Sequence, residues 1–472
     1  MKINLSLLIF LILSILYISF GYGVTISNDS VTNIDQITAL DLMHRSSHFG
    51  FHLLGIIFYL LFSKLFGLSA VTSIEIMLAI LSAAGAAALY QIVLKKFNNT
   101  SQAIITVIIY AFASGVFRFS CQVEYIILVP SLGILSLYFY SKGQYLIAGI
   151  VLGLGLLTSV LLVLFIPIFL MFTSLKEILK KENIIFAISI ITVFLAVNIF
   201  TYRETISGNW SYGGEFDFYK EAFGKINFLR PASIYIYGYI RSFNIVIFLL
   251  PLIFYFLYKF NKELFYILLI TILIHLPFAI PEARYGGYQM TAYPILAISA
   301  GYFLSNLFKK KKYIVQLIIL FYIIINIFIV LSERSFFRDL KETYVQMNNN
   351  LENKSVLIVY QAIKPIKNIY APDLQVYNVL SDYQNELAKI DGYVPIDLAE
   401  VITKNDTIYV LESGVSIPDD YLKLLVSQFT KNQGAKVKGF GLEKVLAMDP
   451  LLQMEKLRGY PLDVYRLTRG QK

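Results

Sequence analysis

Residues 145–172 read YLIAGIVLGLGLLTSVLLVLFIPIFLMF, a run of 28 residues without a single charge. One α-helix of that length would measure about 42 Å, whereas the hydrocarbon core of a bilayer is about 30 Å thick. The polar pair Thr158-Ser159 interrupts the apolar residues near the middle of the run. We therefore expect two short helices, one entering the membrane and one returning, with a break near this pair.

The composition agrees with a membrane protein. Of the 472 residues, 57% are hydrophobic and only 15% are charged, whereas soluble proteins are about 25% charged. This excludes a soluble globular protein. The single cysteine, Cys121, excludes an internal disulfide, and no CxxC motif or Cys/His cluster indicates structural zinc.

The net charge of +9 has a definite location in the chain. Basic residues outnumber acidic ones by 22 to 13 in residues 1–332, whereas residues 333–472 hold 18 of each. The excess therefore lies among the apolar segments. We expect membrane lipid as a partner and no nucleic acid.

Two further runs bear on the topology. Residues 3–20 follow Met1-Lys2 without a small-residue cleavage site, so we expect an uncleaved first membrane helix with a cytoplasmic N-terminus. Residues 51–67, FHLLGIIFYLLFSKLFG, are long enough either to cross the membrane or to lie flat on its outer surface.

The positions of the lysines decide between these topologies. A flat 51–67 segment and a returning pair at 145–172 place 13 lysines on the cytoplasmic side. The opposite choice exports Lys95, Lys96 and Lys142, against the positive-inside rule. We therefore predict an α-helical polytopic membrane protein with 11 crossings. Besides the pair at 145–172, the predicted crossings are residues 3–20, 70–94, 101–117, 121–139, 183–200, 233–258, 264–280, 288–307 and 313–332.

The arginines of the membrane part lie on the other side in this topology. The planar guanidinium suits phosphate and carboxylate recognition, so their position suggests an anion site at the outer face. Alternatively, single arginines anchor loops to lipid headgroups. The six residues are Arg45, Arg118, Arg203, Arg230, Arg241 and Arg284.

Residues 333–472 differ in character from the membrane part. Their charges alternate in sign, and their apolar runs shorten to about five residues. The runs VLIVY (356–360) and TIYVL (407–411) are typical of strands. We predict an extracytoplasmic α/β domain, without a Walker loop, a strand-linked GxGxxG or a nucleophile elbow. Its helix-like stretches are residues 381–389, 418–431 and 442–458.

The first outer loop, residues 21–50, is the most polar stretch between the membrane segments. It contains the candidate acids Asp29 and Asp35. The second element is a further candidate acid, Glu124, near the start of the 121–139 segment. A third element, Pro281-Glu282-Ala283-Arg284-Tyr285, lies between the late helices. Each acid alone is explained by solvation, and only their combination indicates a site.

Together these parts resemble the C superfamily of membrane glycosyltransferases (GT-C), which includes protein O-mannosyltransferases and lipid A aminoarabinose transferases. The resemblance covers most of the chain. It rests on the acidic first loop with its His-containing turn and flat helix, Glu124, the Gly-rich helical pair AGIVLGLGLLTSVL, and the late Arg-Tyr. The sequence lacks the paired Asp-Glu of some members, and His48-Phe49-Gly50-Phe51 only approximates their His-Pro-Pro-Gly.

The resemblance implies transfer of a sugar from a polyprenyl-phosphate donor to a glycan, lipid or protein acceptor, normally with inversion and without a nucleotide cofactor. It makes Asp35 the expected base, with Asp29 as a close rival, and gives Glu124 a role in orienting the acceptor or ordering the loop. Asp35 lies in IDQITAL (34–40), which we expect to be the start of the flat helix. Arg284 would stabilise the leaving lipid phosphate. The remaining residues of the expected substrate-binding set are Tyr285, His48, His44 and Arg241.

Each assignment has an alternative. Asp35 would also suit the N-terminus of a helix, where the macrodipole favours an acid. Arg284 would also suit an interfacial anchor. The spacing of His44, His48 and His52 would hold a divalent metal on one continuous helix, but Gly50 argues against such a helix. We therefore expect no metal and no other cofactor.

The sequence thus predicts a multi-pass glycosyltransferase of the cell (inner) membrane. The alternative is a non-catalytic transporter, flippase or assembly protein for envelope polysaccharide. A transporter would place its ionisable groups near the bilayer midplane, often in broken helices related by internal symmetry. Nearly all of them lie at loop ends here, and this favours an enzyme at the interface.

Overall fold

A computed structural model gives the structure of the chain. It describes residues 4–25, 27–42, 48–173, 177, 179–206, 229–279, 288–350, 356–359, 366, 369–378, 408–411 and 452–469. The chain divides into two compact units. The helical unit comprises Met1–Gly23 and Asp29–Glu333, and the second unit comprises Val24–Asn28 and Arg334–Lys472.

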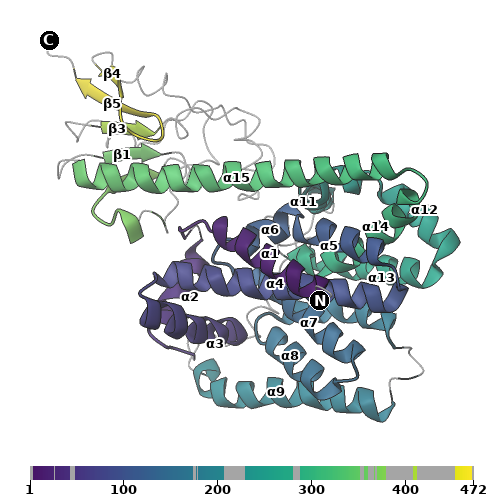
Figure 1. The fold of residues 1–472 in the computed structure, drawn as a ribbon. Helices are drawn as coiled ribbons and strands as arrows, with labels where there is room; N and C mark the ends of the chain where they lie inside the picture. The colour runs from purple at the N-terminus through teal and green to yellow at the C-terminus, as the bar shows by residue number, and fades with distance from the viewer. Residues whose placement is uncertain are drawn as a thin grey trace. The chain divides into compact units, whose positions relative to one another are not determined.

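The helical unit is built from α-helices joined by short 3-10 and π segments (Figure 1). Its first half contains α1 (Leu5–Ser19), α2 (Asn28–Thr38), α3 (Phe49–Phe58), η2 (Tyr59–Lys64), α4 (Ala70–Phe97), α5 (Thr100–Ala111), α6 (Ser114–Ser120), η3 (Tyr125–Ile127), α7 (Leu128–Ser141), α8 (Tyr145–Leu156) and η4 (Val160–Met171). Its second half contains α9 (Lys181–Ile206), α11 (Leu229–Ile247), α12 (Leu250–Phe260), α13 (Lys262–Ala279), η7 (Tyr288–Ala292), α14 (Tyr293–Phe308) and the start of α15 (Lys312–Asn350).

Short polar side chains determine where α4 and α5 begin and where α4 ends. The Ser69 side chain caps α4 by accepting a hydrogen bond from the Thr72 amide at 3.0 Å. Asn98 ends α4 in the left-handed conformation, and the Asn99 side chain caps α5 by accepting from the Gln102 amide at 3.1 Å. The Asn98-Asn99 pair therefore turns the chain between two packed helices.

The predicted break in residues 145–172 is confirmed. Helix α8 ends at Leu156, and Ser159 has an extended backbone from which the 3-10 segment η4 begins. The Ser159 hydroxyl accepts from the Leu161 amide at 3.4 Å, which caps the new segment. The two halves pack against each other and against α7.

Two helices of the described part, α4 and α15, are each long and apolar enough to cross a membrane. Two helix pairs pass the same test only together: α5 with α6, bent by 65°, and residues 236–247 of α11 with α12, bent by 69°. The expected crossings at 101–117 and 233–258 are therefore broken helices. The count of 11 crossings stays a prediction.

Helix packing gathers the lysine-bearing turns at one end of the bundle. The Lys95 ammonium donates to the Ser141 carbonyl, while Lys96 donates to the Met171 carbonyl and pairs with Glu263 at 2.9 Å. We call this the lysine end.

The opposite end of α4 contacts the first loop, since the Gly23 amide donates to Glu75 at 2.8 Å. The Tyr22 amide donates to the Cys121 carbonyl at 2.9 Å, so the turn before α7 also lies at this end of α4. We call this the loop end.

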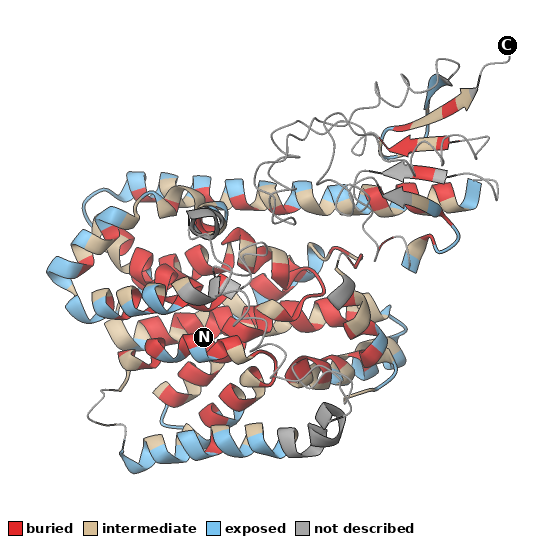
Figure 2. Ribbon diagram, turned by 180° about the vertical axis from the view of Figure 1, so that it is seen from behind, coloured by how far each residue is buried: buried red, intermediate tan, exposed pale blue. Residues whose placement is uncertain are grey.

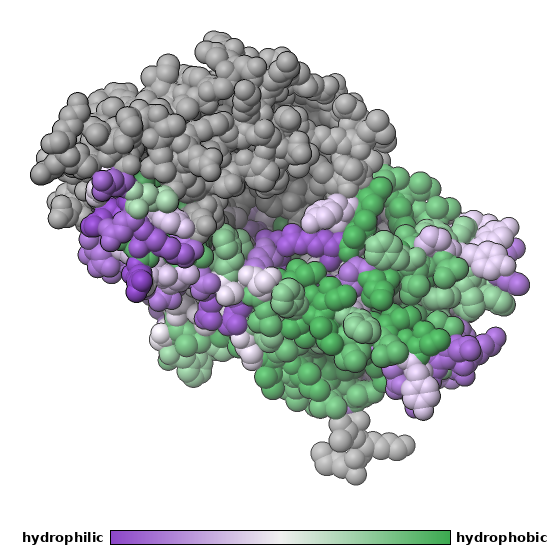
Figure 3. Space-filling model, turned by 90° about the horizontal axis from the view of Figure 1, so that it is seen from above, coloured by the Kyte–Doolittle hydropathy of each residue, from purple (hydrophilic) through white to green (hydrophobic). Residues whose placement is uncertain are grey.

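The core of the helical unit lies along the central helices, whereas α9 and the first part of α15 expose many side chains (Figure 2). Those exposed side chains are largely apolar, among them Ile188, Ile191, Leu317 and Phe328. One face of the molecule carries a broad apolar area with hydrophilic residues at its right edge (Figure 3). Such a surface suits lipid rather than water.

The second unit contains a five-stranded sheet in the order β2-β1-β3-β5-β4. Strand β1 is parallel to β2 and β3, whereas β5 is antiparallel to β3 and β4. Within the two runs expected to be strands, residues 356–359 and 408–411 do form strands. The bounds are β1 (Val356–Val359), β2 (Gln375–Asn378), β3 (Ile408–Leu411), β4 (Leu452–Leu457) and β5 (Val464–Arg469).

One expectation for this unit is wrong. Residues 442–458 were expected to be helix-like, but residues 452–457 form strand β4. Its partner β5 provides the reason, because Glu455 faces Arg466 across the pair and bonds to it at 2.6 Å. The helix-like stretches at 381–389 and 418–431 lie outside the described residues.

Candidate active site

Helix α2 carries the candidate acids of the first loop at the loop end. It is amphipathic, with Asn33, Ile34 and Ile37 buried on one face. The buried Ser30 hydroxyl donates to the Val123 carbonyl and lies 3.2 Å from Oε1 of Glu124. The acidic loop and the Glu124 turn, nearly a hundred residues apart, are thus held together.

Asp35 lies on the exposed face of α2. It is the eighth of the 11 residues of this helix, and its carbonyl accepts from the Ala39 amide at 2.9 Å. The sequence placed it at the start of the flat helix. That placement is wrong, because α2 is a separate helix that ends at Thr38, whereas the helix of the flat segment, α3, starts at Phe49. An N-terminal role in a helix therefore does not explain Asp35.

Asp29 is the second residue of α2. It occupies the first turn, where the macrodipole favours an acid. The helix-terminus explanation that the sequence attached to Asp35 thus fits the position of Asp29 better.

Tyr125, which follows Glu124 in the chain, connects this acid with His48. Glu124 is buried, and the ring of the neighbouring Tyr125 stacks on His48 with centroids 3.9 Å apart. Nδ1 of His48 lies 3.0 Å from the Thr158 carbonyl and carries the proton, because a carbonyl only accepts. His48 therefore ties the start of α3 to the break after α8.

The other predicted histidine positions differ from one another. His52 is buried in α3 with Nε2 2.9 Å from Oδ1 of Asn33 on α2, whereas His44 lies outside the described residues. Over the described ranges, no three His, Cys, Asp or Glu side chains are grouped so that they could hold a metal ion. Helix α3 begins at Phe49 with His48 as its N-cap, so, as expected, His48 and His52 do not lie within one continuous helix, although Gly50 itself lies in the first turn of α3.

Gly50 lets α3 pack closely against the end of α8. Its amide donates to the Leu157 carbonyl at 3.0 Å, at the end of α8. A Cβ atom at this position would lie 3.1 Å from the Thr158 amide nitrogen and nearer still to the Leu154 carbonyl. Only glycine allows this close approach of α3 to α8.

Two of the arginines considered for anion binding pair with the same acid, which was not among the residues expected at the site. Arg118 of α6 and Arg241 of α11 both pair with Glu333 of α15, at 3.0 and 3.3 Å. Exposed fractions are 15% for the Glu333 side chain, 23% for Arg118 and 41% for Arg241. Burial raises the pKa of the Tyr22 phenol well above its ordinary value, and Glu333 raises it further. A charge inside the 233–258 segment should face a cavity or a partner, and Glu333 is such a partner for Arg241.

A second missed acid is Glu75. It is buried near the start of α4 and accepts the Gly23 amide, so it fixes the chain entering the first loop. Its signal in the sequence was an acid within the apolar 70–94 segment. Arg284 and Tyr285 lie outside the described residues.

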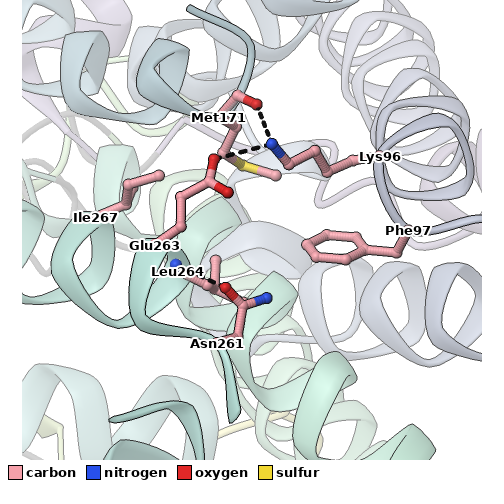
Figure 4. A pocket seen from close by; sticks show the side chains of 7 residues that line it. All are labelled: Lys96, Phe97, Met171, Asn261, Glu263, Leu264 and Ile267. Carbon is pink, nitrogen blue, oxygen red and sulfur yellow. Dashed lines mark hydrogen bonds and ion pairs between the residues drawn. The ribbon is translucent and has the colours of Figure 1, made fainter. Parts of the chain in front are cut away.

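A small hollow at the lysine end contains none of the candidate residues (Figure 4). Lys96 reaches across it to Glu263 and the Met171 carbonyl. The hollow is lined by Lys96, Phe97, Met171, Asn261, Glu263, Leu264 and Ile267. Its size and its filled polar contacts favour a packing defect over a substrate site.

The fold is similar to that of two solved structures of ArnT from Cupriavidus metallidurans. The structure bound to undecaprenyl phosphate has a TM-score of 0.54 at 13% identity, and the apo structure has 0.53 at 12%. Both alignments cover 98% of this chain and 97% of the other. No protein-family model and no curated protein matches the sequence. The likeness in fold confirms the resemblance that the sequence indicated.

Proposed function

We propose that the protein is a multi-pass glycosyltransferase of the cell (inner) membrane that takes a sugar from a polyprenyl-phosphate donor at the outer face. The observation that carries the proposal is a fold shared over nearly the whole chain with ArnT, one structure of which holds undecaprenyl phosphate. In this proposal the N-terminus and the lysine end are cytoplasmic, whereas the loop end and an α/β domain at 333–472 lie outside.

The chemistry follows from the groups at the loop end. The acceptor hydroxyl oxygen forms a bond to the anomeric carbon while the bond from that carbon to the lipid phosphate oxygen breaks. The hydroxyl proton passes to a carboxylate, and guanidinium groups stabilise the charge on the departing phosphate. Because attack and departure occur on opposite faces, the configuration inverts.

Asp35 is the base in this proposal, because its carboxylate is exposed at the loop end and is not needed to cap a helix. Asp29 remains the rival on the same helix. Buried Glu124 acts through Ser30, by holding α2 on the turn before α7. Arg284, with Tyr285, and Arg241 bind the lipid phosphate, while His44 and His48 order the loop beside it.

The test is transfer of radiolabelled sugar from a panel of polyprenyl-phosphate sugars in membranes with matched expression. We expect Asp35→Asn and Arg284→Ala to lose turnover by about 100-fold or more. Asp41→Asn, which removes a carboxylate from the same loop, is the matched control and should retain turnover.

Other outcomes separate the alternatives. Loss in Asp29→Asn with retention in Asp35→Asn would exchange the two roles. Equal loss in Asp41→Asn would mean that the substitutions damage the loop as a whole. No turnover from any donor, by protein that still binds undecaprenyl phosphate, would favour a flippase or an assembly protein.

A further inference from the structure

The two arginines at the loop end share one carboxylate. Nη2 of Arg118 lies 3.0 Å from Oε1 of Glu333, and Nη2 of Arg241 lies 3.3 Å from Oε2 of the same group. Two guanidiniums and one carboxylate leave a formal charge of +1. Each guanidinium has five N–H donors, so the pair has capacity for a more highly charged anion.

The guanidinium groups are positioned from separate helices. The Arg118 guanidinium lies over the ring of Phe119 at 5.1 Å, and its Nε is 3.5 Å from Oε1 of Gln122. The backbone of Arg241 is fixed by the Ser114 hydroxyl, which donates to its carbonyl at 3.0 Å. The pair is therefore held by α6 and α11, while the carboxylate comes from α15.

Exposure determines what an outside anion can reach. Arg241 is the most accessible of the three groups at 41%, whereas Glu333 is largely covered at 15%. An anion can thus approach the pair from the Arg241 side and replace Glu333 without unpacking Arg118. The Arg241–Glu333 pair is part-exposed and therefore weak, so an anion that pairs with both arginines can replace Glu333.

We propose that Glu333 is an internal competitor for the lipid phosphate at the Arg118–Arg241 pair, and this inference rests on the proposed function. A sugar phosphodiester donor carries one negative charge, as Glu333 does. The phosphate monoester that departs carries about −1.5 to −2 at pH 7 and matches the two arginines better. Glu333 gives up the pair to the departing phosphate and reclaims it on release, so it limits product retention.

The first measurement is binding of radiolabelled undecaprenyl phosphate to the purified full-length protein in detergent. We expect Glu333→Gln to bind it about tenfold more tightly, because the competing charge is gone while the size is kept. Arg118→Gln and Arg241→Gln should each bind about tenfold more weakly. Glu342→Gln, which removes an exposed carboxylate from the same helix, is the matched control and should bind as the wild type does.

Unchanged or weaker binding by Glu333→Gln would overturn the inference, because Glu333 would then only support the arginines. Unchanged binding by either arginine variant would overturn it as well. Undecaprenol, inorganic phosphate and phosphatidylglycerol distinguish the sources of the ligand. Equal tightening for phosphatidylglycerol in Glu333→Gln would mean a general headgroup site and would overturn the assignment to the donor lipid.

A measurement on the wild type avoids dependence on variants that fold poorly. Undecaprenyl phosphate, but not undecaprenol, should increase deuterium uptake by the α15 segment around Glu333, because its ion pairs are released. Unchanged or decreased uptake would contradict release. These readouts need no sugar transfer: binding that behaves as expected without turnover would overturn the proposed function alone, and turnover with the wrong binding pattern would overturn this inference alone.

Discussion

Gly50 offers a sharp test of the loop end, because two effects of replacing it with alanine have opposite signs. In a helix that has room, Gly→Ala stabilises by about 0.5–1 kcal/mol, since alanine loses less backbone entropy on folding. Gly50 lies in the first turn of α3, so this gain should apply. The added Cβ, however, meets the Leu154 carbonyl and the Thr158 hydroxyl far inside van der Waals contact.

The magnitude follows from these contacts. Overpacking against backbone costs about 1–3 kcal/mol, and displacing α3 would also weaken the 3.0 Å bond from Gly50 to the Leu157 carbonyl, worth about 1 kcal/mol. We expect Gly50→Ala to destabilise the protein by about 1–3.5 kcal/mol after the helix gain is subtracted. The assay is thermal unfolding in detergent, followed by the soluble fraction after heating and by turnover.

A double-mutant cycle provides the control. Thr158→Ala removes the hydroxyl from the contact but leaves the Leu154 carbonyl, so it should recover part of the loss and not all of it. Wild-type stability or higher in Gly50→Ala would refute the close approach of α3 and α8. Full recovery by Thr158→Ala would mean that the side chain, and not the α8 backbone, sets the limit.

Three further outcomes follow from single contacts. Glu75→Ala should destabilise the protein by about 1–3 kcal/mol and lower turnover, whereas Glu75→Gln, which keeps an acceptor oxygen for the loop amide, should lose less than half as much in both assays. Gly149→Leu should weaken the packing of α8 on α9 and lower the melting temperature by several degrees, because a Cβ there would lie 2.5 Å from Cβ of Ser189. Lys96→Met should change stability by less than about 1 kcal/mol, because the Lys96–Glu263 pair is part-exposed; a larger loss in thermal unfolding would contradict this.

Hydropathy and local polar signals predicted much of the fold. The break at Thr158-Ser159 could be located because a serine inside an apolar run can cap a new segment, and Ser159 does so. Strands β1 and β3 followed from short β-branched runs. Strand β4 was missed because LQMEKL also fits one face of a helix, and only its pairing with β5 decides between the two.

The candidate site was less accessible to sequence reasoning. Acid content indicated the first loop, but the separate helix α2 could not be told from the start of α3 by pattern alone. Glu333 carried no local signal, because its partners Arg118 and Arg241 lie far away in the sequence. Glu75 did carry one, an acid inside an apolar segment.

The contacts of α4 at the lysine end constrain how the protein is made. Lys95 and Lys96 emerge early in translation, yet their partners are Ser141, Met171 and Glu263. The ribosome must therefore synthesise more than 160 further residues before Lys96 can meet Glu263. During that interval the nascent helices reside in the bilayer with this end still open. The contacts of the lysine end are thus complete only after α13 has been made, and a chain that stalls before α13 leaves Lys96 without its Glu263 partner.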